Sequence, residues 1–126
     1  MLSIRISGKA PIYEEIANQI EEMVLTDVVE EDEQLPSIRE LANDLAVNPN
    51  TIQKAYSELE NRGITYSLYG KGIFITHDVD AIKRKKLATL LRQIEGKMKL
   101  FKITGGKKST IMELSDTVFY EKGEEA

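Results

Sequence analysis

Apolar residues recur every three or four positions through most of the N-terminal half of the chain. This spacing predicts an amphipathic helix over residues 11–26 and two shorter helices over 37–46 and 48–62. The acidic stretch between the first two helices, residues 27–34, has no such period and is predicted to be a loop. Residues 4–6, Ile-Arg-Ile, are predicted to form a short strand.

Both short helices carry signals that mark where they begin. Ser37 and Glu40 have the spacing of a capping box, in which each side chain accepts a hydrogen bond from the other residue's backbone N–H. Asn48 is a favourable N-cap for the next helix, and Pro49 suits its first position, where no N–H is needed. Gly63 is placed to end this helix, because glycine is common just past a helix C-terminus.

The apolar period changes in the second half of the chain. Residues 64–76 alternate between apolar and polar positions around a central Gly-Lys-Gly, which predicts a β-hairpin. Helical spacing returns over residues 80–102 and ends at the pair Gly105-Gly106. Ser109 is then predicted to be the N-cap of a last helix.

These elements define a fold class. Two short capped helices joined by about three residues, with a hairpin after them, are typical of a winged helix-turn-helix. The predicted protein is mostly α with a small β-hairpin. It has a winged helix-turn-helix DNA-binding domain over residues 1–76 and a two-helix region over residues 77–126.

The charge of the whole chain does not favour a nucleic-acid partner. The net charge is −4, whereas nucleic-acid-binding domains are usually basic. The average conceals an asymmetry, since residues 1–36 carry a net −7, residues 37–76 are neutral and residues 77–126 carry a net +3. If the partner is anionic, the acidic N-terminal stretch should face away from it. The densest basic run, residues 83–86, is expected to be a solvated helix face.

The residue inventory argues against catalysis. The chain has no Cys and one His, His77, so thiolate metal sites, Cys nucleophiles and multi-His metal sites are excluded. The Gly-Lys-Gly turn lies in a hairpin and is too short to be a phosphate-binding loop. We therefore expect no enzyme activity, no metal and no cofactor. No apolar run approaches the ~18 residues of a membrane span, and no signal peptide is apparent, so a cytoplasmic protein without a membrane partner is expected.

The third predicted helix has the composition of a recognition helix. In helix-turn-helix proteins the N-terminal residues of the second helix of the motif reach base edges in the major groove. Asn50, Thr51 and Lys54 supply polar side chains at that end, and the hairpin tip could bring Lys71 to the DNA backbone. Helix-turn-helix pairs also occur without DNA binding. The alternative is a winged-helix module that binds another protein and no specific DNA.

The chain resembles the GntR family of bacterial transcription regulators over about residues 10–76. Several spaced motifs agree in order: Pro11-Ile12-Tyr13, Leu35-Pro36-Ser37-x-Arg39-x-Leu41-Ala42, Val47-Asn48-Pro49-Asn50-Thr51, Ala55-Tyr56, Leu59-Glu60, Gly63 and Gly70-x-Gly72-x-Phe74. The resemblance implies a repressor-type regulator that binds double-stranded DNA as a dimer. The family often has Gly where this chain has Asp27 and Asp32, and Asp tolerates a left-handed backbone well enough for these turns to survive.

The resemblance also implies roles for single residues. Arg39 would contact DNA, although it could instead pair with Asp44 or Glu40, and Lys54 could instead be a solvated side chain. Ser37 would cap its helix next to a phosphate, and Asn48 is expected to act mainly as a cap. The DNA-binding set is Ser37, Arg39, Asn48, Asn50, Thr51, Lys54, Gly70, Lys71 and Gly72.

The C-terminal region resembles the helical tail of the short-tailed, YtrA-like subfamily. It is too short to enclose a drug-sized ligand by itself, but its apolar stripe can pack against a second copy of the chain. This implies a homodimer, which suits a palindromic operator. The alternative is that the stripe folds back on the winged domain of the same chain, and whether a small-molecule effector binds stays open. The stripe consists of Leu87, Leu90, Leu91, Ile94, Met98 and Phe101.

Overall fold

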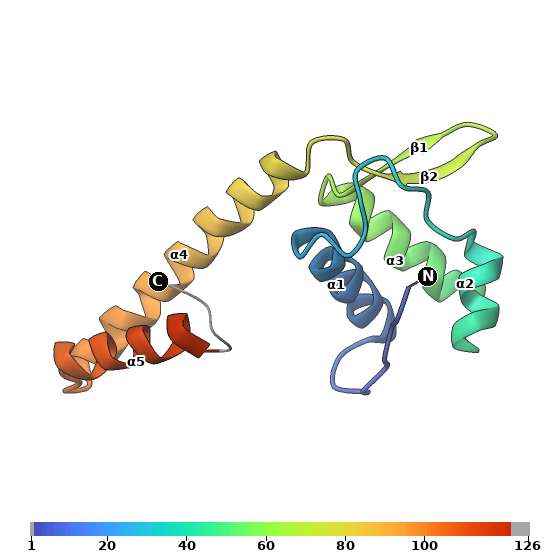
Figure 1. The fold of residues 1–126 in the computed structure, drawn as a ribbon. Helices are drawn as coiled ribbons and strands as arrows, with labels where there is room; N and C mark the ends of the chain where they lie inside the picture. Colours follow the sequence, from blue (N-terminus) through green and yellow to red (C-terminus); the bar gives the residue numbers. More distant parts are fainter. Residues whose placement is uncertain (1, 122–126) are drawn as a thin grey trace. The chain divides into compact units, whose positions relative to one another are not determined.

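The observed elements follow the predicted order closely. The structure is a computed structural model that describes residues 2–121, and it is mostly helical with one antiparallel hairpin (Figure 1). The elements are α1 (Ile12–Leu25), α2 (Ile38–Leu45), α3 (Pro49–Asn61), β1 (Thr65–Leu68), β2 (Gly72–Ile75), α4 (Val79–Ile103) and α5 (Lys108–Tyr120).

The predicted caps of α2 and α3 are confirmed. The Glu40 N–H donates to Ser37 Oγ at 3.1 Å, and the Ser37 N–H donates to Glu40 Oε1 at 2.9 Å, which completes the capping box. The Asn48 side chain accepts a hydrogen bond from the Asn50 N–H at 2.8 Å, and Pro49 occupies the first position of α3. Both helices therefore begin at side chains that satisfy N–H groups which the helix itself leaves unpaired.

The core lies between α1, α2, α3 and the hairpin. Most apolar residues of these three helices face inward and are buried, and Tyr56 is 3% exposed, as expected for a core residue. Its hydroxyl donates to the Pro36 carbonyl oxygen at 2.8 Å, which satisfies a polar group that burial would otherwise penalise. The largest fully buried side chains are Ile16, Ile20, Leu41, Ile52, Leu59, Ile64, Ile75 and Val24.

The wing has a third, strand-like edge that the sequence did not predict. In the hairpin, Thr65 pairs with Ile75 and Leu68 pairs with Gly72. Residues 32–35 run along the other side of β2, where the Leu35 N–H donates to the Ile73 carbonyl at 2.8 Å and the Ile75 N–H donates to the Glu33 carbonyl at 2.8 Å. The segment before α2 and the wing are therefore joined by backbone hydrogen bonds.

The two Asp residues at expected glycine positions adopt the left-handed backbone. Asp27 has φ 60° and Asp32 has φ 62°, so the expectation that these turns survive is confirmed. Asp27 also accepts a hydrogen bond from Lys83 Nζ at 3.0 Å. This bond ties the loop after α1 to the beginning of α4.

Two predictions from the sequence are wrong. Residues 4–6 form no strand, because the Gln19 side chain bonds both the N–H and the carbonyl of Arg5, at 2.9 and 2.6 Å, and takes the place of a strand partner. Ser109 is not an N-cap, since α5 begins at Lys108 and its N-cap is Lys107. The turn before α5 is tight: Gly105 has φ 106°, and the Phe101 ring covers Gly106 where a Cβ would lie. The chain can therefore start the helix before Ser109.

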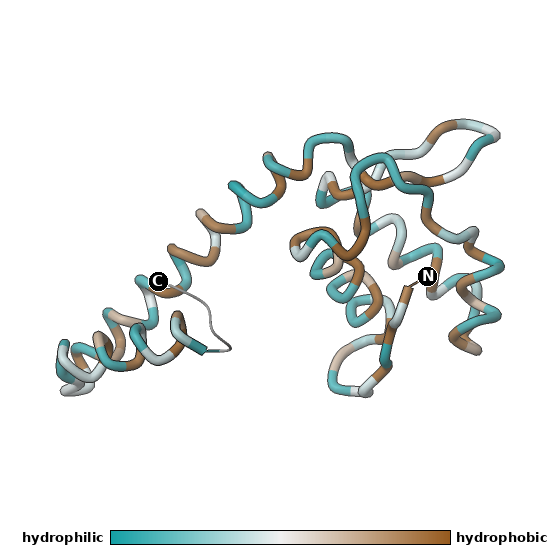
Figure 2. The backbone as a smooth tube through the Cα atoms, in the orientation of Figure 1, coloured by the Kyte–Doolittle hydropathy of each residue, from teal (hydrophilic) through white to brown (hydrophobic). Residues whose placement is uncertain are grey.

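The chain forms two compact units, one as far as Lys85 and one from Lys86 onward. The helix α4 begins in the first unit, where Val79 is buried and Ile82 packs against the core. The domain boundary placed between residues 76 and 77 stays a prediction. In the second unit, hydrophobic residues recur along α4 and α5 (Figure 2). No helix within residues 2–121 is both long and apolar enough to cross a membrane.

Candidate nucleic-acid interface

The first turn of α3 presents polar side chains to solvent. Asn50 is exposed and Thr51 is half-buried. The Asn50 backbone N–H is held by Asn48, whereas its side-chain amide makes no hydrogen bond to any other described residue. This amide is therefore available to a ligand. It has both a donor and an acceptor, as readout of an adenine edge requires.

Lys54 lies one turn further along α3, over an aromatic ring. Its Nζ is 4.2 Å from the centroid of the Tyr13 ring on α1, within the range of a cation–π interaction. It is the only Lys or Arg of α3. The side chain is exposed, its ammonium group lies over this ring, and it forms no salt bridge in the part of the chain that the structure describes.

Arg39 is exposed on α2 and makes none of the ion pairs considered from the sequence. Glu40 is occupied by the capping box, and the Ser37 N–H, with its hydroxyl as a second donor, holds the pKa of Glu40 below its usual value. Neither Glu40 nor Asp44 forms a salt bridge with Arg39 among residues 2–121. The guanidinium is therefore free to meet an anion.

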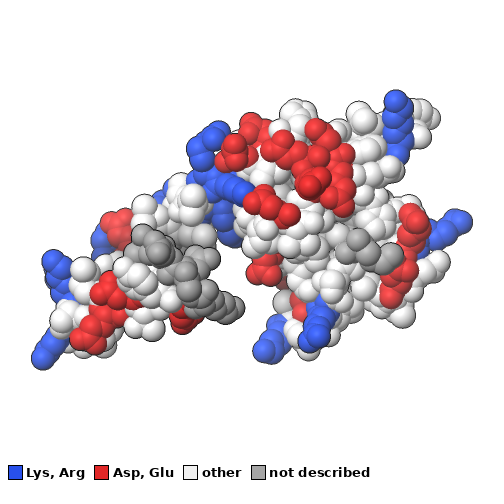
Figure 3. All heavy atoms as spheres, in the orientation of Figure 1, with Lys and Arg blue, Asp and Glu red and all other residues white. Residues whose placement is uncertain are grey.

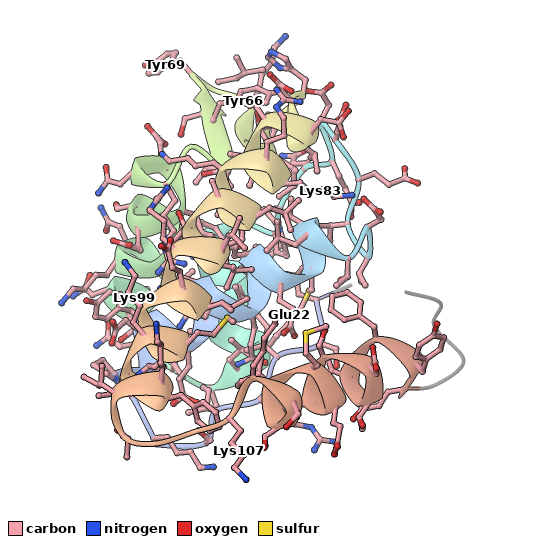
Figure 4. All side chains as sticks on the ribbon, turned by 90° about the vertical axis from the view of Figure 1, so that its left-hand side faces the viewer. Glu22, Tyr66, Tyr69, Lys83, Lys99 and Lys107 are labelled. Carbon is pink, nitrogen blue, oxygen red and sulfur yellow. The ribbon has the colours of Figure 1, made fainter. Side chains whose placement is uncertain are left out.

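The wing tip is built from glycines with positive φ. Gly70 has φ 74° and Gly72 has φ 126°, and the exposed Lys71 lies between them. Tyr69, whose role the sequence left open, is fully exposed and points away from the protein at this tip (Figure 4). Gln34 supports the tip from outside the hairpin, since its Nε2 donates to the Lys71 carbonyl oxygen at 2.8 Å.

The predicted DNA-binding residues all lie in the first compact unit, on three neighbouring elements. In Figure 1 the hairpin extends toward the side of α3 on which α2 lies. Acidic side chains gather over the segment between α1 and α2, whereas a basic side chain stands at the tip of the hairpin (Figure 3). Exposed carboxylates in that segment belong to Asp27, Glu30, Glu31, Asp32 and Glu33.

His77, expected at the surface or in a linker, is exposed at the base of the wing. Its Nδ1 is 3.6 Å from Asp32 Oδ1, and the same carboxylate oxygen accepts a hydrogen bond from the Tyr66 hydroxyl at 2.7 Å. This bond raises the pKa of Tyr66, because it stabilises the protonated phenol. No three metal-ligating side chains come together within the described range.

The C-terminal unit leaves most of the predicted apolar stripe exposed, whereas Phe101 is half-buried. Leu87 and Leu91 are 65% and 67% exposed, respectively. Helices α4 and α5 border an open groove of about 830 Å³, whose lining includes Lys99 and Lys107, both labelled in Figure 4. Four of the six stripe residues line it, and Leu87 and Leu90 do not. The apolar lining is Leu91, Ile94, Met98, Phe101, Ile111 and Met112.

Comparison with known proteins identifies the fold and its motifs. Residues 12–75 match the family described as bacterial regulatory proteins of the gntR family. The chain belongs to this family. It is 39% identical over 102 residues to the HTH-type transcriptional repressor YtrA of Bacillus subtilis, and the alignment covers 81% of this chain and 71% of YtrA. The alignment is longer than residues 1–76, so it extends into the C-terminal helical region.

Solved structures of transcription regulators share this fold. The chain is similar to a transcriptional regulator from Oenococcus oeni, with a TM-score of 0.77 and 32% identity over 94% of this chain and 99% of the other. It is also similar to the DNA-binding domain of AraR in complex with operator ORX1, with a TM-score of 0.53 and 26% identity over 60% of this chain and 96% of that domain.

Sequence reasoning assigned no role to two residues that the structure brings into the interface. Tyr13 belongs to a motif that carried the family resemblance, but nothing in the local pattern places its ring under Lys54. Gln34 is a polar residue in a loop, and its partner Lys71 is 37 residues away along the chain. No local signal could have revealed either pairing.

Proposed function

We propose that this chain is a sequence-specific DNA-binding transcription regulator, acting as a repressor, that binds an inverted-repeat operator as a homodimer. The observation that carries the proposal is the capped helix α3. Its first turn carries an unpaired amide at Asn50, and Lys54, one turn further along the helix, is a positioned cation. Membership of a family with repressors among this chain's relatives supports the regulatory role.

Within this interface, helix and wing have different tasks. Asn50 and Thr51, at the N-terminal end of α3, would read base edges in the major groove. Ser37, Arg39, Lys54 and the wing tip at Lys71 would hold phosphates, which gives affinity without sequence information. Asn48 contributes chiefly by capping α3 and so setting the position of its first turn.

The tail would supply the two-fold symmetry that a palindromic operator requires. The stripe on α4 and the groove beside it leave a large apolar surface in water, which a second copy would cover. We assign residues 1–76 to DNA binding and residues 77–126 to dimerisation. The regulator would act in the cytoplasm without catalysis or cofactor, and a small-molecule effector is left open.

The test is a footprint on the promoter of the protein's own gene, combined with binding to random duplex DNA across a salt series. A protected palindrome and a steep fall in affinity with salt are expected, because phosphate contacts release counterions. Substituting Arg39→Ala should weaken this binding without unfolding the protein, since the Arg39 side chain is exposed and forms no salt bridge with a described residue. Absence of salt-dependent binding to any duplex would favour the protein-interaction module instead.

A further inference from the structure

Lys54 forms no salt bridge with the acidic residue one turn further along its own helix. Glu58 lies four residues further along α3, on the same helix face and within reach of Lys54. The Glu58 carboxylate is instead bound by Arg62, whose Nε lies 2.9 Å from Glu58 Oε2. The same guanidinium also reaches Glu21 on α1 at 2.7 Å. Arg62 thus occupies Glu58 and leaves the charge of Lys54 uncompensated by any described carboxylate.

The Tyr13 ring, and not a carboxylate, lies next to the Lys54 ammonium group. Tyr13 is the second residue of α1, half-buried and packed against the core. Its ring lies 4.2 Å from Lys54 Nζ, and its hydroxyl bonds to no other described residue. Because the helices α1 and α3 share one core, the ring is a fixed platform for an otherwise mobile side chain.

A ring and a carboxylate differ in how much of the lysine's positive charge remains available to a ligand. A carboxylate neutralises the ammonium group and must be displaced before a phosphate can bind. An aromatic face attracts the cation while the full charge remains available, and it restricts a side chain that has four rotatable bonds. Part of the conformational entropy of the Lys54 side chain is therefore lost during folding. As a result, binding a phosphate costs less entropy.

We propose that Tyr13 is a positioning residue for DNA binding, whose ring holds the Lys54 ammonium group ready for a backbone phosphate. The proposal rests on the proposed function, since it presupposes that α3 meets DNA. It assigns to α1, outside the helix-turn-helix pair, a share in the affinity of the complex. The role belongs to the ring, so a phenylalanine should fulfil it.

A double-mutant cycle tests this pairing. Tyr13→Leu keeps an apolar side chain against the core and should weaken binding to operator and random duplex alike, by roughly two- to fivefold per site. Tyr13→Phe should bind like the wild type. In a Lys54→Ala background, Tyr13→Leu should have no further effect, because its consequence passes through Lys54.

A second readout is independent of DNA. In the free protein, the ring current of Tyr13 should shift the terminal methylene protons of Lys54 upfield in NMR spectra. The shift should persist in Tyr13→Phe and disappear in Tyr13→Leu. If Tyr13→Leu does not fold, Tyr13→Met replaces it in both measurements with the same expectations.

The outcomes separate this proposal from the proposed function. If the wild type binds no duplex DNA at low salt, the proposed function fails, and the positioning role fails with it. If the wild type binds but the effects of Tyr13→Leu and Lys54→Ala add independently, only the positioning role is overturned. If Tyr13→Phe is as weak as Tyr13→Leu, the hydroxyl acts rather than the ring, which also overturns it.

Discussion

The Gln34 side chain donates a hydrogen bond of 2.8 Å to the carbonyl oxygen of Lys71, at the tip of the wing. The same amide lies where a Cβ on Gly72 would be, with only 2.5 Å between that Cβ and Gln34 Nε2. The tip is therefore held from the loop before α2, and this requires a glycine at position 72. The Gln34 side chain thus adds to the backbone hydrogen bonds that couple the wing to the segment before α2.

Replacing Gly72 should destabilise the protein for two reasons. Its φ of 126° is strained for any L side chain, and the added methyl would push Gln34 away from Lys71. We expect Gly72→Ala to lower the free energy of unfolding by about 1–3 kcal/mol, measured by denaturant titration. Gly96→Ala is the matched control: it lies in α4 with nothing within 4 Å, and it should raise helix stability by about 1 kcal/mol. Equal effects of the two substitutions would contradict the proposed constraint at the wing.

Helix and wing should respond differently to the DNA sequence. Asn50→Ala is expected to cost roughly 1–3 kcal/mol of binding energy on the operator and much less on random duplex, because a base contact is lost. Lys71→Ala should weaken both complexes about equally and lower the salt slope by about one per monomer. Asn61→Ala, at the opposite end of α3, should change neither. The reverse pattern, with Lys71 discriminating between sequences, would mean that the wing reads the bases.

The apolar groove of the C-terminal unit should control assembly. The wild type is expected to sediment as a dimer at micromolar concentration, and Ile94→Glu should shift it toward monomer by burying a charge in the interface. Gln93→Glu adds the same charge one residue earlier, outside the groove lining, and should leave the dimer intact. Analytical ultracentrifugation measures all three. A wild type that is monomeric under these conditions would refute the dimer.

Stability at alkaline pH should depend on Tyr56. Burial, aided by the Glu40 carboxylate, raises the pKa of its phenol well above the ordinary value. The folded state therefore keeps the proton longer than the unfolded state, so the stabilisation is complete below about pH 10 and is lost progressively above it. The expected slope is about 1.4 kcal/mol per pH unit. Tyr56→Phe should flatten it in denaturant titrations, whereas Tyr69→Phe, at an exposed ring, should not.

Local chemistry determined where the elements of this protein begin and end. Ser37 and Asn48 cap their helices as expected, because a capping side chain bonds an N–H only two or three residues away. The two wrong predictions come from contacts between residues further apart along the chain. A strand at residues 4–6 requires a partner strand, and the Gln19 side chain supplied the hydrogen bonds instead. At Ser109 the packing of Phe101 over Gly106 fixed the turn, and α5 began before it.

The tertiary structure alone decided how the interface residues are supported. The Lys54 ammonium group lies over the Tyr13 ring because α1 and α3 share a core. Lys54 does not pair with Glu58, because Arg62 binds that carboxylate. Arg62 also binds Glu21, 41 residues away along the chain. Lys71 is held by Gln34 across a similar separation. The sequence pattern shows which residues are polar and exposed. Which of them are paired, and which keep a free charge, depends on contacts between distant segments that only packing brings together.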